Sequence, residues 1–360
     1  MTRKRSISRK DAKFAKEDNI SRDYRAPWWL PGGNLQTIYA RSLGGNYLVS
    51  YRRERWRTPD EDFIDLDWLD ATADFPLVVL FHGLEGGSQS HYATSLMAEL
   101  KRQGWRGVVP HFRGCSAEAN CLPRAYHAGD SQELDWILRR LKEQDVKRKI
   151  HVIAVSLGGN MLLKWLGEQG EAAQSIVERA VAVSAPLDLQ AAARQLDFGF
   201  KKILYTRHFL RSMQPKVLAK IAAHGLAIEP LAVRACSTFR EIDDLYTAPF
   251  HGFNNADDYW ARTSSKPWLK AIRVPTLVIN ARNDPFLPES ALPNAEEVSD
   301  AVTLEFPRDG GHVGFVTGQF PGQFDWLPRR ALKFFEDSHG VNISLTDEKA
   351  APGFGPPAMT

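Results

Sequence analysis

Cysteine is scarce in this chain, which has only Cys115, Cys121 and Cys236 among its 360 residues. Three cysteines do not make an even disulfide framework, and the spacing between Cys115 and Cys121 is not that of a zinc site. We therefore expect neither structural disulfides nor a metal ion. A reducing compartment is the natural place for such a protein.

Long apolar runs are also missing. No stretch approaches the ~20 residues that a membrane-spanning helix needs. The charged N-terminus is not followed by the apolar segment of a secretory signal. These absences predict a cytoplasmic protein.

The chain has little excess of either charge. Its formal net charge is +3 at pH 7, which gives no reason to expect a nucleic-acid partner. Basic residues gather in residues 1–25, which we expect to form a solvated, disordered tail. The alternative is peripheral contact with an anionic membrane surface, where each basic residue contributes ~1 kcal/mol. The oligomeric state is left open by the sequence.

What the sequence does contain is enough apolar material for a large core. Hydrophobic residues make up 43% and charged residues 25%, as in ordinary globular proteins. We expect one domain over residues 26–338, followed by a second disordered tail over 339–360.

The domain opens with two predicted strands, 51–57 and 62–68, on either side of a turn. The second alternates apolar and acidic residues, which predicts a half-buried antiparallel strand. Continuous apolar runs then alternate with helical patterns, and this predicts a mostly parallel twisted sheet with helices on both faces. The expected strands of this part are 76–81, 105–110, 149–155, 179–184, 274–280 and 302–306, of which 76–81 should be buried on both faces. The expected helices are 91–103, 130–143, 158–168 and 327–336.

Residues 187–268 interrupt this alternation. They lie between two predicted strands, contain helical runs without a buried-strand pattern, and are rich in aromatic and basic residues. Because the segment is too long for a loop, it predicts an inserted helical cap.

Ser156 stands at the abrupt end of the apolar strand 151–155 and directly before an amphipathic helix. A sharp strand-to-helix turn exposes a serine hydroxyl and points the helix N-terminus at it. Such a turn needs small residues on both sides, and Gly158 and Ala154 supply them. The alternative is an ordinary turn or helix-capping serine.

The run His82-Gly83-Leu84-Glu85-Gly86-Gly87 follows the strand 77–81. A glycine-rich loop at this point can direct backbone N–H groups at the serine, so we expect Leu84 and Leu157 to donate the two hydrogen bonds of an oxyanion hole. The plainer interpretation is a strand-to-helix turn. His82 is expected to be structural, because a histidine that ends a buried strand usually satisfies loop backbone.

Two further strand ends carry an acid and a histidine. Asp284 follows the strand 274–280, and the prolines at 285 and 288 restrict the loop that carries it. A fixed position suits an acid that must hold an imidazole in one tautomer. His312 follows the strand 302–306 and has glycines on both sides. Either residue could instead be an ordinary turn residue.

These four elements are all predicted at the carboxyl ends of parallel strands, the edge at which open α/β sheets bind ligands. They occur in the order oxyanion loop, serine, acid, histidine, which is the order found in α/β-hydrolases. We therefore expect Ser156 as the nucleophile, Asp284 as the orienting acid and His312 as the general base.

On these residues the chain resembles the YheT-like branch of the α/β-hydrolase superfamily, to which mammalian α/β-hydrolase-domain lipases and plant embryogenesis-associated proteins are related. The resemblance covers about residues 25–338. It implies the α/β-hydrolase fold and hydrolysis of carboxylic esters, with lipid esters as substrates of some eukaryotic relatives. Ala154 departs from the glycine that is usual two residues before the serine. The matching runs are 28–37, 82–87, 111–116, 156–160, 283–285 and 310–312.

The expected function is that of a serine esterase or lipase acting through an acyl-serine intermediate, on a small-molecule or lipid ester. The triad and the backbone donors suffice for this chemistry, so no cofactor is expected. Two alternatives stay open. The same triad would serve an acyltransferase, and the fold would also serve as a catalytically silent binding module.

Overall fold

The computed structural model describes residues 24–44, 47–71 and 75–337. The expected tails therefore lie outside the described residues, apart from the last two positions of the first tail. One of these, Tyr24, is buried, and its hydroxyl donates to the Val316 carbonyl at 2.7 Å. The folded part of the chain thus begins before residue 26, because this aromatic ring packs against Phe315 and Trp326.

One eight-stranded sheet forms the centre of the molecule, in the order β1-β2-β4-β3-β5-β6-β7-β8. The strands from β3 to β8 are mutually parallel, and β1 and β2 add an antiparallel edge. This confirms the mostly parallel sheet. The strands are β1 Arg52–Arg57, β2 Phe63–Leu69, β3 Leu77–Phe81, β4 Arg106–Pro110, β5 Ile150–Val155, β6 Arg179–Val183, β7 Thr276–Ile279 and β8 Val302–Glu305.

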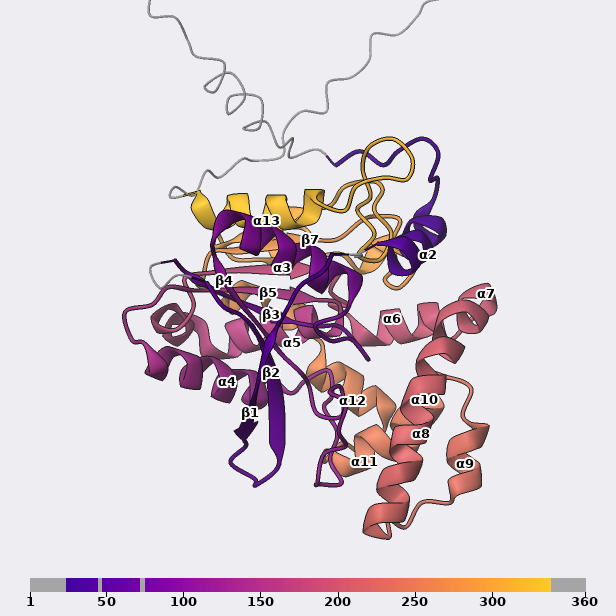
Figure 1. Ribbon diagram of the computed structural model, residues 1–360. Coiled ribbons are helices and arrows are strands. Elements are labelled where there is room, and N and C mark those ends of the chain that lie inside the picture. The colour runs from indigo at the N-terminus through magenta and orange to yellow at the C-terminus, as the bar shows by residue number, and fades with distance from the viewer. Residues whose placement is uncertain (1–23, 45–46, 72–74, 338–360) are drawn as a thin grey trace, which may run out of the picture.

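Helices cover both faces of the sheet (Figure 1). Helices α3 and α13 lie on one face, and α4 and α5 lie on the other. Each face of the sheet has its own hydrophobic core, and alternate residues of β3 contribute to each. Val78 packs in the core beneath α3 and α13, and Val79 packs in the core beneath α4 and α5. A strand buried on both faces needs the continuous apolar pattern that the sequence shows. The helices outside the cap are α2 Gly33–Leu43, α3 His91–Gln103, α4 Ser131–Gln144, α5 Leu157–Gln169 and α13 Trp326–Glu336.

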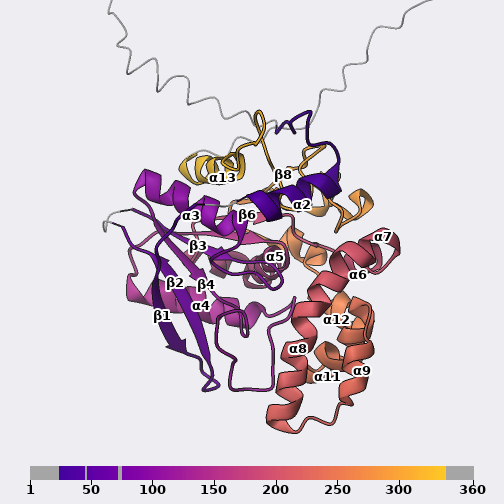
Figure 2. The ribbon, with the colours of Figure 1, turned by 45° about the vertical axis from the view of Figure 1, so that its right-hand side comes forward.

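Helices alone fill the segment between β6 and β7, and they form a lobe beside the sheet (Figure 2). The lobe has a small apolar core of its own, to which Leu210, Ile221 and Tyr246 belong. Two π-helical turns, Lys202–Thr206 and Asp243–Thr247, interrupt its helices. The helices of this cap are α6 Leu189–Leu196, α7 Gly199–Lys201, α8 Arg207–His224, α9 Pro230–Ala235, α10 Phe239–Ile242, α11 Ala248–Phe250 and α12 Ala256–Thr263.

The expectation that the strand around residues 62–68 is half-buried was wrong, because every residue of β2 is buried. Its acids Asp65 and Asp67 lie directly opposite Arg55 and Arg53 of β1. Each arginine binds the facing carboxylate through two nitrogens, at 2.7 to 2.9 Å. The paired arginines cover the carboxylates, so an alternating pattern here does not mark a solvent-facing side.

Within the ranges that the structure describes, each helix is too short or too polar to cross a membrane. The same residues contain no group of three or more histidines, cysteines and acids arranged to hold a metal ion.

Candidate active site

Ser156 occupies the sharp turn between β5 and α5. Its backbone has φ 54° and ψ −121°, a region that a residue with a side chain adopts at a cost of ~1–3 kcal/mol. The turn is held by close packing: a Cβ atom on Gly158 would lie 2.5 Å from the carbonyl oxygen of His82. Ala154 is fully buried in the core, so its methyl group is accommodated where glycine is usual.

His312 and Asp284 complete a hydrogen-bonded chain with this serine. The distance from His312 Nε2 to Ser156 Oγ is 2.9 Å, and the distance from His312 Nδ1 to Asp284 Oδ2 is also 2.9 Å. Because a carboxylate only accepts hydrogen bonds, Nδ1 carries the ring proton and Nε2 presents its lone pair to the serine hydroxyl. The sequence selected these three residues from three separate strand ends, and the fold brings them together.

The glycine-rich loop after β3 lies against the same serine. A Cβ atom on Gly83 would be 3.0 Å from Ser156 Cβ, so only glycine lets the loop approach this closely. The amides on either side of Leu84 are occupied, since Gly83 N–H donates to Tyr92 Oη at 2.9 Å and Glu85 N–H donates to Tyr126 Oη at 2.8 Å. Leu84 itself lines the cavity beside Ser156.

Leu157 is the first residue of α5, where a helix leaves its N–H groups without intrahelical partners. It lines the same cavity as Leu84 and Ser156. The helix N-terminus places the positive end of a helix dipole next to the serine.

The glycine-rich loop is also tied to the cap. The Glu85 carboxylate accepts a hydrogen bond from the Ser212 hydroxyl and pairs with Lys216 Nζ at 2.6 Å. Both partners belong to α8, the helix whose Phe209 and Met213 line the cavity. A displacement of α8 would therefore disturb the loop that carries Leu84.

Gln36 and Thr37 hold in place the two loops that carry Asp284 and His312. The sequence did not reveal this role. Thr37 Oγ1 accepts from His312 N–H at 2.8 Å, and Gln36 Oε1 accepts from Gly310 N–H at 2.8 Å. Asn283 Nδ2 donates to the same glutamine oxygen at 3.2 Å. The run Trp28–Thr37 could have indicated this role, because it is one of the runs on which the family resemblance rests and had no other function assigned to it.

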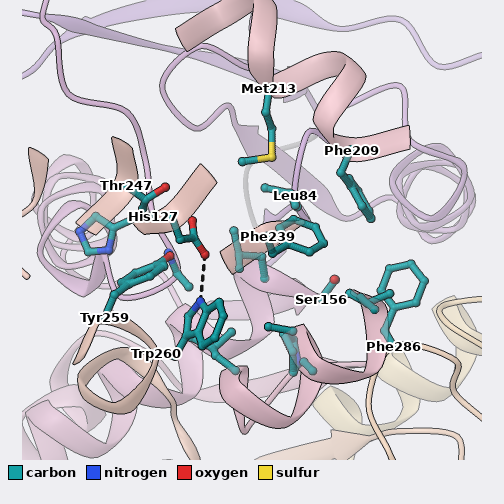
Figure 3. Close-up of a pocket in the computed structure, with 18 of the residues that line it drawn as sticks. Leu84, His127, Ser156, Phe209, Met213, Phe239, Thr247, Tyr259, Trp260 and Phe286 are labelled. Carbon is teal, nitrogen blue, oxygen red and sulfur yellow. Dashed lines mark hydrogen bonds between the residues drawn. The ribbon is translucent and has the colours of Figure 1, made fainter. Parts of the chain in front are cut away.

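Phe286 packs on the histidine. Its ring stacks on the His312 imidazole with centroids 3.8 Å apart, and its N–H donates to Asp284 Oδ1 at 2.8 Å. The residue therefore fixes both partners of the pair, and it also lines the cavity. Figure 3 shows it beside Ser156.

His82 has the structural contacts that were expected of it. The ring is fully buried, its Nδ1 lies 2.8 Å from the Gly83 carbonyl oxygen, and its Nε2 accepts from Phe112 N–H at 3.0 Å. Burial lowers the pKa of His82 to about 3, so the ring is neutral and both of its nitrogens are engaged.

A cavity of about 120 Å³ separates Ser156 from the cap helices. Most of its wall is aliphatic or aromatic, and most of that wall comes from the cap. Apart from residues named above, the lining comprises Tyr126, His127, Ala128, Pro186, Leu189, Ala192, Ala193, Leu196, Phe239, Asp243, Thr247, Tyr259 and Trp260.

The model of one known family, the alpha/beta hydrolase fold, matches residues 76–319. The chain belongs to this family. The match confirms the fold class that the sequence predicted. The predicted branch is confirmed by YheT of Escherichia coli (strain K12), which is 37% identical over 82% of this chain and 88% of its own length.

Other relatives extend the comparison. Phospholipase ABHD3 of Homo sapiens is 26% identical over 90% of this chain and 82% of its own length. The medium-chain fatty acid ethyl ester synthase/esterase 2 of Saccharomyces cerevisiae is 30% identical over 73% of this chain and 62% of its own length. The relatives make this an esterase/lipase-type hydrolase family.

Among solved structures, the esterase Pf2001 of Pyrococcus furiosus has a TM-score of 0.50. It is 17% identical to this chain, and the alignment covers 81% of this chain and 96% of that one. At this identity the similarity concerns the fold alone.

Proposed function

We propose that this protein is a serine hydrolase of carboxylic esters that works through an acyl-serine intermediate. The observation that carries the proposal is the hydrogen-bonded chain from Ser156 through His312 to Asp284, with each link at 2.9 Å. The neighbouring amides of Leu84 and Leu157 support it, because acyl transfer needs donors for a developing oxyanion.

The first half of the reaction forms the acyl-enzyme. Ser156 Oγ attacks the ester carbonyl carbon while His312 Nε2 takes the hydroxyl proton. The negative oxygen of the tetrahedral intermediate accepts hydrogen bonds from Leu84 and Leu157 N–H. His312 then gives its proton to the departing alcohol, and Asp284 stabilises the imidazolium in between.

The second half restores the enzyme. A water molecule attacks the acyl carbon after giving a proton to His312, and the acid leaves as the proton returns to Ser156 Oγ. Apolar walls around the serine favour substrates with an aliphatic acyl chain, because each buried methylene contributes ~0.8 kcal/mol to binding. The relatives named as phospholipase and fatty acid ethyl ester esterase support lipid esters as the substrate class.

Acyl transfer is a second candidate, favoured by the yeast relative that is named as both a synthase and an esterase. In that reaction an alcohol takes the place of water in the second half. Product analysis separates the two: a mixture of water and ethanol yields the free acid from a hydrolase and an excess of ethyl ester from a transferase.

The proposal is tested by Ser156→Ala with p-nitrophenyl esters as substrates. We expect kcat to fall by ~10³-fold or more while the thermal melting curve is retained. The control is Ser265→Ala, since Ser265 is buried and its hydroxyl has no hydrogen-bond partner in the described residues. Near-normal turnover by Ser156→Ala would exclude the assigned nucleophile.

A further inference from the structure

One end of the cavity is polar, and it is the end away from the serine. In Figure 3, Thr247, His127 and Tyr259 lie across the cavity from Ser156 and Phe286. Asp243 belongs to the same end, because its side chain hydrogen-bonds to Thr247 and its Oδ2 accepts from Trp260 Nε1 at 2.9 Å. The hydrophobic part of the wall lies between the two ends.

Asp243 is an unusual residue for such a wall. It is only 6% exposed, and it lines the cavity from a π-helical turn, a feature that often occurs at functional sites. The Thr247 hydroxyl, at the other end of the same turn, hydrogen-bonds to it. The nearby charges that act on it come from two further acids, Asp197 and Asp244.

Burial raises the pKa of Asp243 to about 7, against the hydrogen bonds from Thr247 and Trp260, which lower it. Its carboxyl group is therefore able to act as a hydrogen-bond donor as well as an acceptor. The two hydrogen-bond partners of this carboxyl group, the Trp260 indole and the Thr247 hydroxyl, both belong to the cap. They hold the carboxyl group in a fixed place relative to the cavity.

His127 adds a donor at the same end. Its ring lies 5.9 Å from that of Tyr259, and burial lowers its pKa to about 4, so it is neutral. Because Gly129 N–H donates to His127 Nδ1 at 3.1 Å, the ring proton is on Nε2. The polar end thus offers both an acceptor and a donor.

We infer that Asp243 determines substrate specificity by binding a hydroxyl group on the acyl chain, some way from the ester bond. This rests on the proposed function, because it assigns the acyl group to the cavity next to Ser156. The acyl group is the part of an ester that stays bonded to the serine after the alcohol leaves. The cavity wall is apolar next to Ser156 and becomes polar at Asp243. An acyl chain that is apolar near the ester bond and carries a hydroxyl further along matches this order.

A hydroxyl fits better than an ammonium group for two reasons. It can accept from a protonated carboxyl and donate to an ionised one, so it binds Asp243 in either state. An ammonium group would have to lose its hydration inside a largely apolar cavity, which is costly unless several acceptors replace the water. The described wall near Asp243 instead mixes donors with acceptors.

The test compares p-nitrophenyl esters of even chain length, from butanoate to dodecanoate, each with and without a terminal hydroxyl. The measured quantity is the ratio of kcat/KM for the hydroxylated ester to that for the plain ester. Short chains should give a ratio below one, because their hydroxyl is buried among apolar side chains. At one length the ratio should rise to about tenfold above one, because there the hydroxyl reaches Asp243.

Asp243→Leu should keep the ratio below one at every length, and Thr247→Val should lower its maximum several-fold. Asp300→Asn is the control, since Asp300 is exposed and is not part of the cavity wall; its ratio should follow the wild type. Asp243→Asn, which is nearly isosteric, covers the case in which the leucine variant does not fold. It should keep a maximum at the same length, because an amide still binds a hydroxyl.

The wild-type series alone can overturn the inference. Active hydrolysis with a ratio below one at every length would exclude a hydroxyl site and leave the proposed function intact. A terminal amino ester that outperforms the hydroxylated one at the best length would exclude it in favour of a cation. If no ester of the series is hydrolysed, both the inference and the proposed function fail.

Discussion

The sheet and the cap hold their side chains by different means. At the sheet edge, hydrogen bonds between distant parts of the chain fix the loops, as when Gln36 accepts from Gly310 N–H. In the cap, short helices pack around a small apolar core, and contacts such as the Glu85–Lys216 ion pair and the hydrogen bond from Tyr246 Oη to the Pro123 carbonyl tie them to loops of the sheet. The comparison teaches that the reacting groups are fixed by the sheet, whereas the cap shapes the space for the substrate.

The largest effect should come from the sheet side, in Asp284→Asn. An amide can donate to His312 Nδ1 and so favour the wrong tautomer, which we expect to lower kcat by ~10⁴-fold with little change in KM. Steady-state kinetics with one p-nitrophenyl ester measure this. Asp300→Asn, an exposed change of the same kind, serves as the control. A loss below tenfold would show that Asp284 does not orient the histidine.

Thr37→Val should have the next largest effect. The change conserves shape but removes the acceptor for His312 N–H, and leaving this buried amide without a partner costs ~1–3 kcal/mol. We expect kcat to fall by roughly ten- to a hundredfold, equally for short and long acyl chains. A change in chain-length preference instead would contradict the division of tasks between sheet and cap.

The tie between the two regions is tested by Glu85→Gln and Lys216→Met. Each should lower kcat several-fold, because each loosens the loop that carries Leu84. The double variant should be little worse than either single variant, since both break the same link. Independent, additive effects would mean that the pair does not act as a unit.

The smallest expected effect is on stability, in Asp243→Asn. The pKa of Asp243 is about 7 in the folded chain and near the ordinary aspartate value in the unfolded chain. As the pH rises between these values, the unfolded chain releases a proton that the folded chain keeps, so wild-type stability falls in this window. The asparagine variant lacks this loss.

We therefore expect the Tm of Asp243→Asn, relative to wild type, to increase from pH 5 to pH 8 by roughly 3 °C, which corresponds to about 2 kcal/mol for a domain of this size. Differential scanning fluorimetry at both pH values measures the change. A constant difference would mean that Asp243 titrates normally.

The sequence predicted the sheet and selected Ser156, Asp284 and His312, because each follows a predicted strand within a short loop whose composition is distinctive. It did not predict the roles of Gln36 and Thr37, since their partners Asn283, Gly310 and His312 lie more than 240 residues away. Such pairing depends on the completed fold rather than on any local pattern.

The polar end of the cavity was missed for a related reason. Asp243 lies in a stretch where helical and π-helical turns alternate, so no regular period marks the side that faces the cavity. The burial of Asp65 and Asp67 escaped notice because it depends on arginines of the neighbouring strand. In both cases the missing information is tertiary.

The most direct test of the central claim is covalent labelling with a fluorophosphonate probe, followed by peptide mass spectrometry. A serine whose proton is taken by His312 should form one phosphonyl adduct, on the peptide that contains Ser156. Ser156→Ala should form none. An adduct on another serine, or no adduct on folded wild-type protein, would contradict the account.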